Sequence, residues 1–162
     1  MLRLSKMTDY AIVLLTYVAS GADRETHAAR QLALSSGLPL PTVSKVLKMI
    51  SRAGLLVSVR GKHGGYRLVR DAKEVSVADI ICAIEGPVSL TECGARQMPL
   101  LCDFESSCPV RENWRTINGA VTDALAQLSL EDMTHPLRAC AGHSHEHATV
   151  DTITRPLLEL VK

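Results

Sequence analysis

The stretch LPLPTVSKVLKMISRAGLLVSVRGKHGGYRLV, residues 38–69, decides the fold of this chain. Its first part predicts a helix from Pro41 to Ala53, because proline suits a first helical turn, where its missing N–H is no loss. Four apolar residues recur there at helical spacing and form one face: Val43, Val46, Leu47 and Ile50. Two β-prone runs follow, 55–59 and 66–69, on either side of the glycine-rich and basic RGKHGG. The stretch therefore predicts a helix followed by a hairpin with a mobile tip.

Two further helices are predicted ahead of this stretch. Residues 7–20 are mostly apolar and end before Gly21, which is typical of a buried helix with a glycine stop. Thr26 is a candidate N-cap for a second helix, His27 to Ser36. Three helices followed by a hairpin predict a winged helix-turn-helix fold, mainly α with a small β-wing.

The polar side of the third helix and the wing hold the candidate DNA contacts. Such a helix offers polar side chains to base edges in the major groove, and a basic wing reaches phosphates or the minor groove. The candidates are Thr42, Ser44, Lys45 and Lys48 on the helix, and Arg60, Lys62 and His63 in the wing. Residues 1–73 hold 12 Lys and Arg against 4 Asp and Glu, whereas residues 74–162 hold 6 against 13. The basic half is therefore expected to meet a polyanion, the alternative being a solvated lysine face on an ordinary α+β domain.

The second half predicts a fourth helix capped by Ser76, a turn-rich loop over 88–108, and a long helix from Pro109 to about Leu130. An apolar stripe follows the long helix: Trp114, Ile117, Val121, Leu125 and Leu128. Such a stripe is typical of a dimerisation helix, although packing on its own domain would also produce it. The expected organisation is a DNA-binding region over 1–73, a metal-binding loop and dimerisation helix over 74–133, and a flexible tail over 134–162.

Cys93, Cys102 and Cys108 are spaced C-x8-C-x5-C in the loop between the last two helices. Three thiolates this close in the chain can converge on one metal centre, and thiolates favour zinc or iron–sulfur clusters. Spacing does not choose between these, although the absence of a CxxC pair argues against a standard zinc finger. Free thiols are the alternative. Cys82, on the fourth helix, is expected to be a small packing residue.

A second group of soft donors lies near the end of the chain: Cys140, His143, His145 and His147. These side chains could bind zinc, copper or nickel, but a polar tail that merely contains histidines is the interpretation favoured by composition.

Together, these motifs resemble the IscR/NsrR family of iron–sulfur winged-helix regulators over about residues 1–133. The resemblance rests on LSKMTDYAIVLLTYVA, LPLPTVSKVLKMISRAGLL, RGKHGGYRL, VADIICAIEGP and the three-cysteine loop. The segment TEC-x8-C-x5-CPVRENWRTIN is similar to the branch that regulates SUF iron–sulfur assembly. The resemblance implies a homodimer on a palindromic double-stranded DNA operator, a repressor of cluster-assembly genes whose binding is tuned by its cluster.

The fourth ligand of such a cluster differs between branches of the family. IscR-like members have a histidine three residues after the last cysteine, where this chain has Arg111. NsrR-like members use an acidic residue on the first helix of the partner subunit, a position that Asp9 matches. The resemblance thus implies a cluster on the three loop cysteines and Asp9, with 2Fe–2S favoured and 4Fe–4S open. Alternatively, Asp9 is a first-turn acid that complements the helix dipole.

Several other classes of protein are not expected. The sequence has no CxxC, nucleophile elbow, phosphate loop or paired acid–base site, so an enzyme is not predicted. No apolar run reaches membrane-spanning length, and MLRLSKMTDY lacks a signal-peptide pattern, so a cytoplasmic location away from membranes is expected. Two alternatives stay open: a nitric-oxide or redox-responsive regulator on the same scaffold, and a metal-delivery protein that uses the histidine-rich tail.

Overall fold

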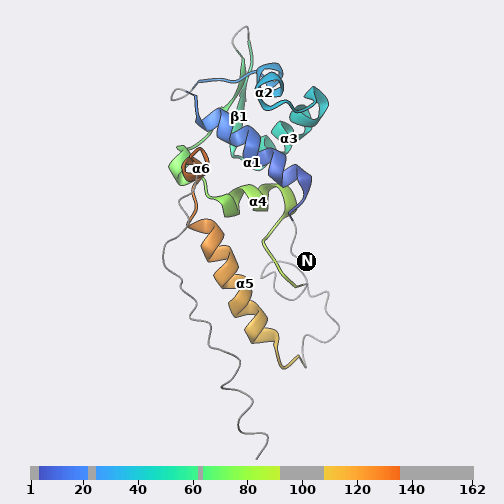
Figure 1. Ribbon diagram of the computed structural model, residues 1–162, viewed down its shortest axis with the longest axis vertical. Helices are drawn as coiled ribbons and strands as arrows, with labels where there is room; N and C mark the ends of the chain where they lie inside the picture. The colour runs from blue at the N-terminus through green and yellow to red at the C-terminus, as the bar shows by residue number, and fades with distance from the viewer. Residues whose placement is uncertain (1–3, 22–24, 62–63, 92–107, 136–162) are drawn as a thin grey trace, which may run out of the picture.

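The computed structural model of the chain describes residues 4–21, 25–61, 64–91 and 108–135. Helices and one two-stranded antiparallel sheet make up this part. In chain order the elements are α1 (Lys6–Ala19), α2 (Ala29–Ser36), α3 (Leu40–Arg52), β1 (Leu56–Val59), β2 (Gly65–Leu68), the 3-10 turn η1 (Ala72–Glu74), α4 (Val77–Glu85), α5 (Arg111–Ala126) and α6 (Leu130–Met133). The first four helices, the hairpin and α6 form one body, from which α5 extends (Figure 1). This arrangement confirms the predicted winged helix-turn-helix, mainly α with a small β-wing.

The core of this body is aliphatic. The apolar face predicted for α3 is confirmed, because Val43, Val46, Leu47 and Ile50 are all 0% exposed. The other buried members of the cluster are Ala11, Leu14, Leu15, Val18, Leu32, Leu55, Leu56, Val75, Ile80 and Leu130. Complete burial of an aliphatic side chain of this size stabilises a fold by about 1.5–3 kcal/mol. The burial of one whole side of α3 fixes which side of that helix faces solvent.

The start of α2 differs from the prediction. Its N-cap is Ala28 rather than Thr26, and no side chain caps the helix. The reason is a β-bridge in which the backbones of His27 and Tyr66 exchange two hydrogen bonds of 2.9 Å each. This bridge requires an extended backbone at His27, so α2 begins only at Ala29. The same bridge connects the segment before α2 to the wing. The third helix begins at Leu40, one residue earlier than predicted.

Two glycines of RGKHGG are required by close backbone approach beside the turn that joins the two strands of the wing. A Cβ on Gly64 would lie 2.4 Å from the carbonyl oxygen of Val59. A Cβ on Gly65 would lie 2.6 Å from the backbone of His27. Only a residue without a side chain fits such contacts. Gly64 therefore permits the tight turn within the hairpin, and Gly65 permits the hairpin to pack closely against the backbone that leads into α2.

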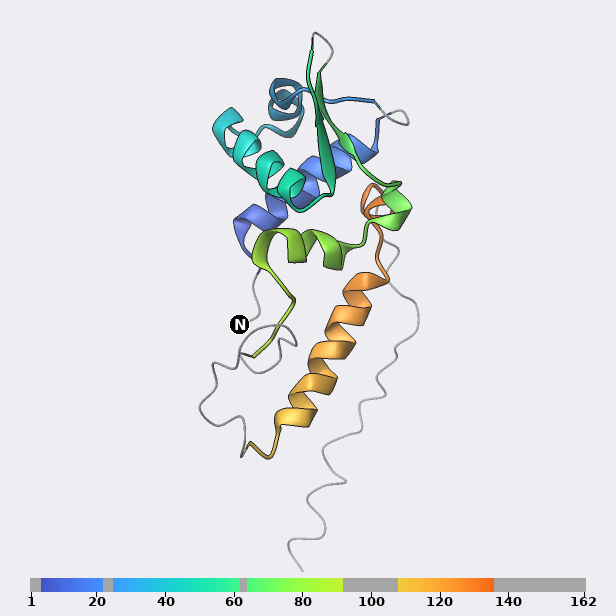
Figure 2. The same ribbon diagram turned by 180° about the vertical axis from the view of Figure 1, so that it is seen from behind.

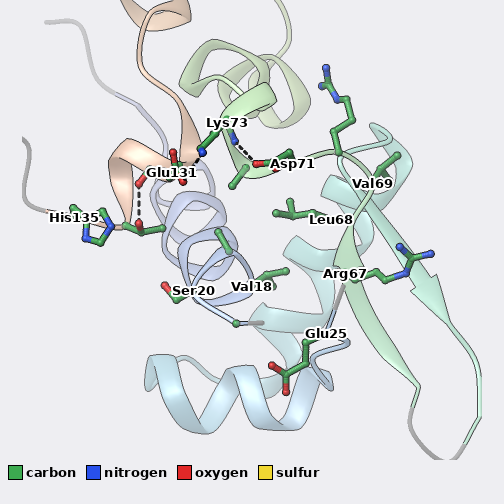
Figure 3. A pocket seen from close by; sticks show the side chains of 15 residues that line it. Val18, Ser20, Glu25, Arg67, Leu68, Val69, Asp71, Lys73, Glu131 and His135 are labelled. Carbon is green, nitrogen blue, oxygen red and sulfur yellow. Dashed lines mark hydrogen bonds and ion pairs between the residues drawn. The ribbon is translucent and has the colours of Figure 1, made fainter. Parts of the chain in front are cut away.

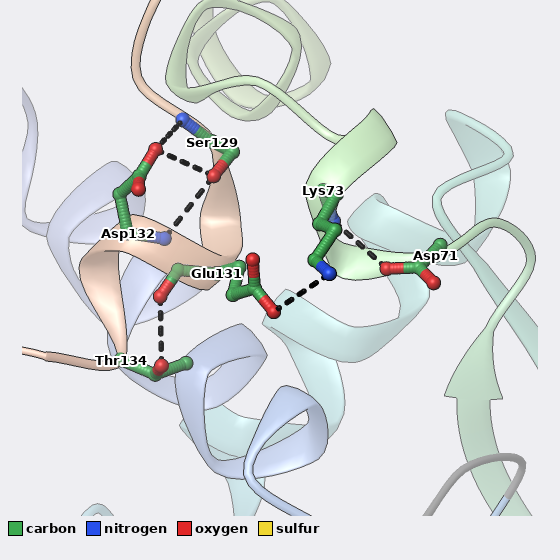
Figure 4. A network of polar contacts seen from close by, with 6 residues as sticks. All are labelled: Asp71, Lys73, Ser129, Glu131, Asp132 and Thr134. Carbon is green, nitrogen blue, oxygen red and sulfur yellow. Dashed lines mark hydrogen bonds and ion pairs between the residues drawn. The ribbon is translucent and has the colours of Figure 1, made fainter.

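The helix predicted to run to about Leu130 is shorter, and the prediction is wrong at this end. Helix α5 ends at Ala126, and α6 starts afresh behind a capping box formed by Ser129 and Asp132 (Figure 4). Between the two helices the backbone turns back and pairs with the segment that precedes α4. Val77 N–H donates to the Leu128 carbonyl at 2.8 Å, and Leu130 N–H donates to the Val75 carbonyl at 2.7 Å. This pairing inserts Leu130, 0% exposed, into the core.

Candidate nucleic-acid interface and cysteine-loop stems

The solvent side of α3 holds the residues predicted to contact DNA. Ser44, Lys45 and Lys48 are exposed, and Thr42 is half-buried. Exposed hydroxyl and ammonium groups can donate to phosphate oxygens and to base edges. Because the opposite side of the helix is locked in the core, these polar groups are presented in one fixed direction.

The wing lies at the same end of the body as α3, away from α5 (Figure 2). Arg60, one of the three predicted wing contacts, follows β1 directly and is exposed. The other two predicted wing residues, Lys62 and His63, lie outside the described residues. The described parts of the helix and wing together present polar and basic groups in a layout suited to a duplex.

The C-terminal stem of the cysteine loop, which begins at Cys108, is among the described residues. Cys108 is half-buried and free, and its carbonyl accepts a hydrogen bond of 3.4 Å from the N–H of Arg111, the first residue of α5. The other two predicted ligands, Cys93 and Cys102, lie outside the described residues, as does the group of Cys140 and three histidines. Within the described ranges no three metal-ligating side chains are grouped together.

Asp9 is exposed on the first turn of α1. Its carboxylate is therefore accessible to a ligand or partner from outside its own body, and it also occupies the position of the alternative helix-dipole role. The exposed position agrees with both interpretations.

Next to Asp9, the start of α1 is bonded to the end of α4, which leads into the cysteine loop. The buried hydroxyl of Thr8 donates to the carboxylate of Glu85, and the Ser5 N–H donates to the same oxygen at 2.8 Å. The Thr8 hydrogen bond is the main reason that the pKa of Glu85 lies below its ordinary value of 4.5, and the Ser5 N–H lowers it further. The sequence did not reveal this link.

The Glu85 link predicts a pH dependence of stability. A carboxyl whose pKa is lowered by folding stabilises the folded protein above its unfolded pKa, and this stabilisation is lost as the pH falls through the folded pKa. Replacing Thr8 with valine removes the largest cause of the shift. Between about pH 5 and pH 3, stability should therefore fall less steeply in Thr8→Val than in the wild type. Urea unfolding at each pH measures this, with Thr16→Val on the same helix as the control; equal slopes would contradict it.

Cys82 does not have the role expected from the sequence. It lies on α4, as predicted, but it is exposed rather than packed in the core. The apolar side of α4 is instead supplied by Val77, Ile80 and Ile81. A cysteine on the solvent side of a helix contributes little to packing.

Helix α5 has an apolar side that is only partly covered by the other described residues, so part of it faces solvent. Trp114 and Ile117 are 37% and 44% exposed, and Val121 and Leu125 are half-buried. These are members of the stripe predicted for a dimerisation helix. Adjacent exposed apolar side chains of this size are typical of a surface that meets another chain.

A polar cavity of about 1030 Å³ lies beneath the wing, between the end of α1, the end of β2 and α6 (Figure 3). Side chains of both charges line it, among them Arg67, Glu25 and the pair Lys73–Glu131, whose charged atoms are 3.6 Å apart (Figure 4). Both members of the pair are largely exposed, so the contact contributes at most about 1 kcal/mol. The cavity lies apart from the polar side of α3.

None of the described helices is both long enough and apolar enough to span a membrane.

Comparison with known proteins shows which family has this sequence and this fold. Residues 4–136 match the Rrf2 family, described as iron-dependent transcriptional regulators. The HTH-type transcriptional regulator IscR of Photorhabdus laumondii is 28% identical over 134 residues, which cover 83% of this chain and 80% of that protein. The structure of CymR, the global cysteine regulator of B. subtilis, aligns with a TM-score of 0.65 and 26% identity over 83% of this chain and 97% of its own. The T. potens IscR structure, at 22% identity, shares the fold with a TM-score of 0.62 over 87% of this chain and 94% of its own. The chain, a transcription regulator rather than an enzyme, belongs to the Rrf2 family.

Proposed function

We propose that this regulator is a cytoplasmic homodimer that binds a palindromic DNA operator and represses SUF iron–sulfur assembly genes under the control of an iron–sulfur cluster. DNA binding is proposed because Ser44, Lys45 and Lys48 are exposed on one side of α3, while the opposite, apolar side is fully buried. A recognition helix needs both properties, because its orientation must be fixed before its side chains can read a groove.

The operator would be read by two copies of this surface. The α3 helix of each subunit enters a major groove, and Arg60 contacts the neighbouring backbone. Helix α5 pairs with its counterpart through the side that holds Trp114 and Ile117. A two-fold dimer of this kind would read half-sites separated by one turn of the duplex, about 34 Å, or by a multiple of that distance.

The proposed cluster ligands are Cys93, Cys102, Cys108 and Asp9 of the partner subunit. The donor set fits an iron–sulfur group, since thiolates are its usual ligands and a carboxylate oxygen binds iron more weakly. The free, half-buried thiol of Cys108 and the exposed carboxylate of Asp9 agree with these roles, and the iron dependence in the family description supports them. When bound, the group would supply a labile link that oxidants or nitric oxide can break.

The described contacts suggest how the state of the bound group would affect DNA binding. Asp9 lies on α1, which packs against α3 in the core and is held to the end of α4 through Glu85. A ligand bond formed or broken at Asp9 would therefore bias the position of α1 and, with it, the reading helix. Rigid-body shifts at subunit interfaces are an ordinary means of switching.

DNA binding is tested by replacing Lys45 and Lys48 with alanine together. Removing one lysine–phosphate interaction reduces the slope of log affinity against log salt by about 0.9, so the double replacement should reduce it by about 2 and weaken operator binding. Fluorescence anisotropy with an operator duplex over a salt series measures this slope. Lys73→Ala is the matched control, because Lys73 pairs with Glu131 at the cavity beneath the wing. An unchanged slope in the double variant would overturn the placement of α3 on DNA.

A further inference from the structure

Asn118 is the only buried residue of α5, all of whose residues are described. It is 8% exposed, while the apolar stripe of the same helix is more exposed. A buried amide costs free energy unless its donors and acceptors are bonded. Its burial on a helix with so little other buried surface therefore calls for a specific partner.

That partner is the backbone that leads from α4 into the cysteine loop. The Asn118 Oδ1 accepts a hydrogen bond of 3.0 Å from the Leu90 N–H, and its Nδ2 donates one of 3.0 Å to the Val88 carbonyl. The two backbone groups belong to residues two apart, so the side chain pairs with this segment as a neighbouring strand would. Among side chains of this size only a carboxamide can accept and donate in this way.

The contact fixes the first stem of the loop on the same helix that begins just after the loop. Cys93 follows Leu90 by three residues in the sequence. At the other stem, Cys108 is bonded to the first residue of α5, seven residues from Asn118 and about 10 Å away along the helix axis. Both stems are thus attached to one rigid element about two turns apart.

We propose that Asn118 is a positioning residue for the proposed metal-ligand loop, whose described first stem, Val88 to Leu90, it holds in register on α5. This inference rests on the proposed function for the identity of the bound group, but the Asn118 contact itself does not. Without the contact, the first stem would sample more conformations. A cysteine thiolate that detached from the bound group would then rebind less often, and the group would be lost faster.

The contact is tested first in the metal-free protein by amide hydrogen exchange at Leu90. In Asn118→Asp the donor to Val88 is removed, and in Asn118→Leu both hydrogen bonds are removed at similar side-chain volume. Leu90 exchange should accelerate by roughly 10- to 100-fold in the Leu variant. Asn113→Asp, an identical replacement at an exposed position of α5, should leave it unchanged. Unchanged exchange in Asn118→Leu would show that Asn118 does not hold the Val88–Leu90 backbone.

The positioning role is tested on the full-length protein purified anaerobically. The visible absorption and circular dichroism bands of the bound group should shift in Asn118→Asp and Asn118→Leu, and loss of iron to a chelator should be several-fold faster than in the wild type. Leu90→Pro, which deletes the donated N–H and leaves α5 untouched, should reproduce this behaviour even where an Asn118 variant folds poorly.

The outcomes separate the two proposals. If the wild type holds iron and sulfide but the variants match it in spectrum and chelator kinetics, the positioning role of Asn118 is wrong. If the wild type holds no iron or sulfide, the proposed cluster function fails, and the positioning role falls with it. Faster Leu90 exchange in Asn118→Leu would then show that the Asn118 contact is purely structural.

Discussion

Replacing Leu130 with alanine is expected to lower the free energy of unfolding by about 3 kcal/mol, because it leaves a cavity in the middle of the winged-helix core. Leu130 is 0% exposed, and α6 packs against α1 and η1. Large-to-small replacement at such a site loses the transfer free energy of the removed atoms and leaves a void that the surroundings fill incompletely. The cost is a large share of the stability of a small domain.

Urea denaturation followed by circular dichroism measures this loss, with Leu34→Ala as the matched control. Leu34 is 80% exposed on α2, so the same chemical change there should alter stability by less than about 0.5 kcal/mol. Equal effects of the two substitutions would show that α6 is not part of the core. Operator binding by Leu130→Ala should weaken at temperatures where the variant begins to unfold.

Replacing Cys93, Cys102 and Cys108 with alanine together is expected to abolish iron and sulfide binding. Thiolates are the strong donors of the proposed set, and without them the remaining oxygen ligand does not retain a cluster. Asp9→Ala should be milder, because solvent can occupy the vacated position; its cluster should form but differ in spectrum and lability.

Iron and sulfide assays and visible spectra of anaerobically purified protein measure both effects. Cys82→Ala is the matched control, since that thiol is exposed on α4 and has no proposed metal role. A triple variant with normal iron and sulfide would refute the whole cluster assignment. If Asp9→Ala matched the wild type in spectrum, lability and response of DNA binding, Asp9 would have no ligand role.

The fold was predictable from the sequence wherever local signals decided the structure. Helix α3 shows this best, because its apolar period, its proline near the start and the glycine after it all agree. Once that apolar side is buried, the exposure of Ser44, Lys45 and Lys48 follows, so the polar side of the candidate DNA interface was predictable too. The metal-ligand assignment stays a prediction, since two of the loop cysteines lie outside the described residues.

The errors arose where residues distant in sequence decided the local structure. The Thr26 cap was wrong because His27 pairs with Tyr66, a residue of the wing. The end of α5 was wrong because Leu128 and Leu130 pair with the backbone before α4. One local signal was overlooked there: Ser129 and Asp132 have the spacing of a capping box and mark a new helix start.

Asn118 was missed although it leaves a weak trace in the sequence. Asparagine followed by glycine is unfavourable inside a helix, so its presence in the middle of α5 indicates a role other than helix formation. The identity of that role depends on Val88 and Leu90, about thirty residues away. Periodicity and spacing contain no information on such a contact.

The position of Leu130 in the core also governs the order in which a newly made chain becomes active. All residues of the reading helix and wing are synthesised by position 69, yet the core beneath them stays open until Leu130 has been made. At about 5–20 residues per second, translation from the wing to Leu130 takes roughly 3–12 seconds. During that interval the nascent chain contains the DNA-reading surface on an unfinished fold. Stable binding to the proposed operator is thus expected only after the cysteine loop and α5 have been translated. A truncated product that lacks the second half of the chain, to which we assign the proposed cluster, would also lack a complete winged-helix core.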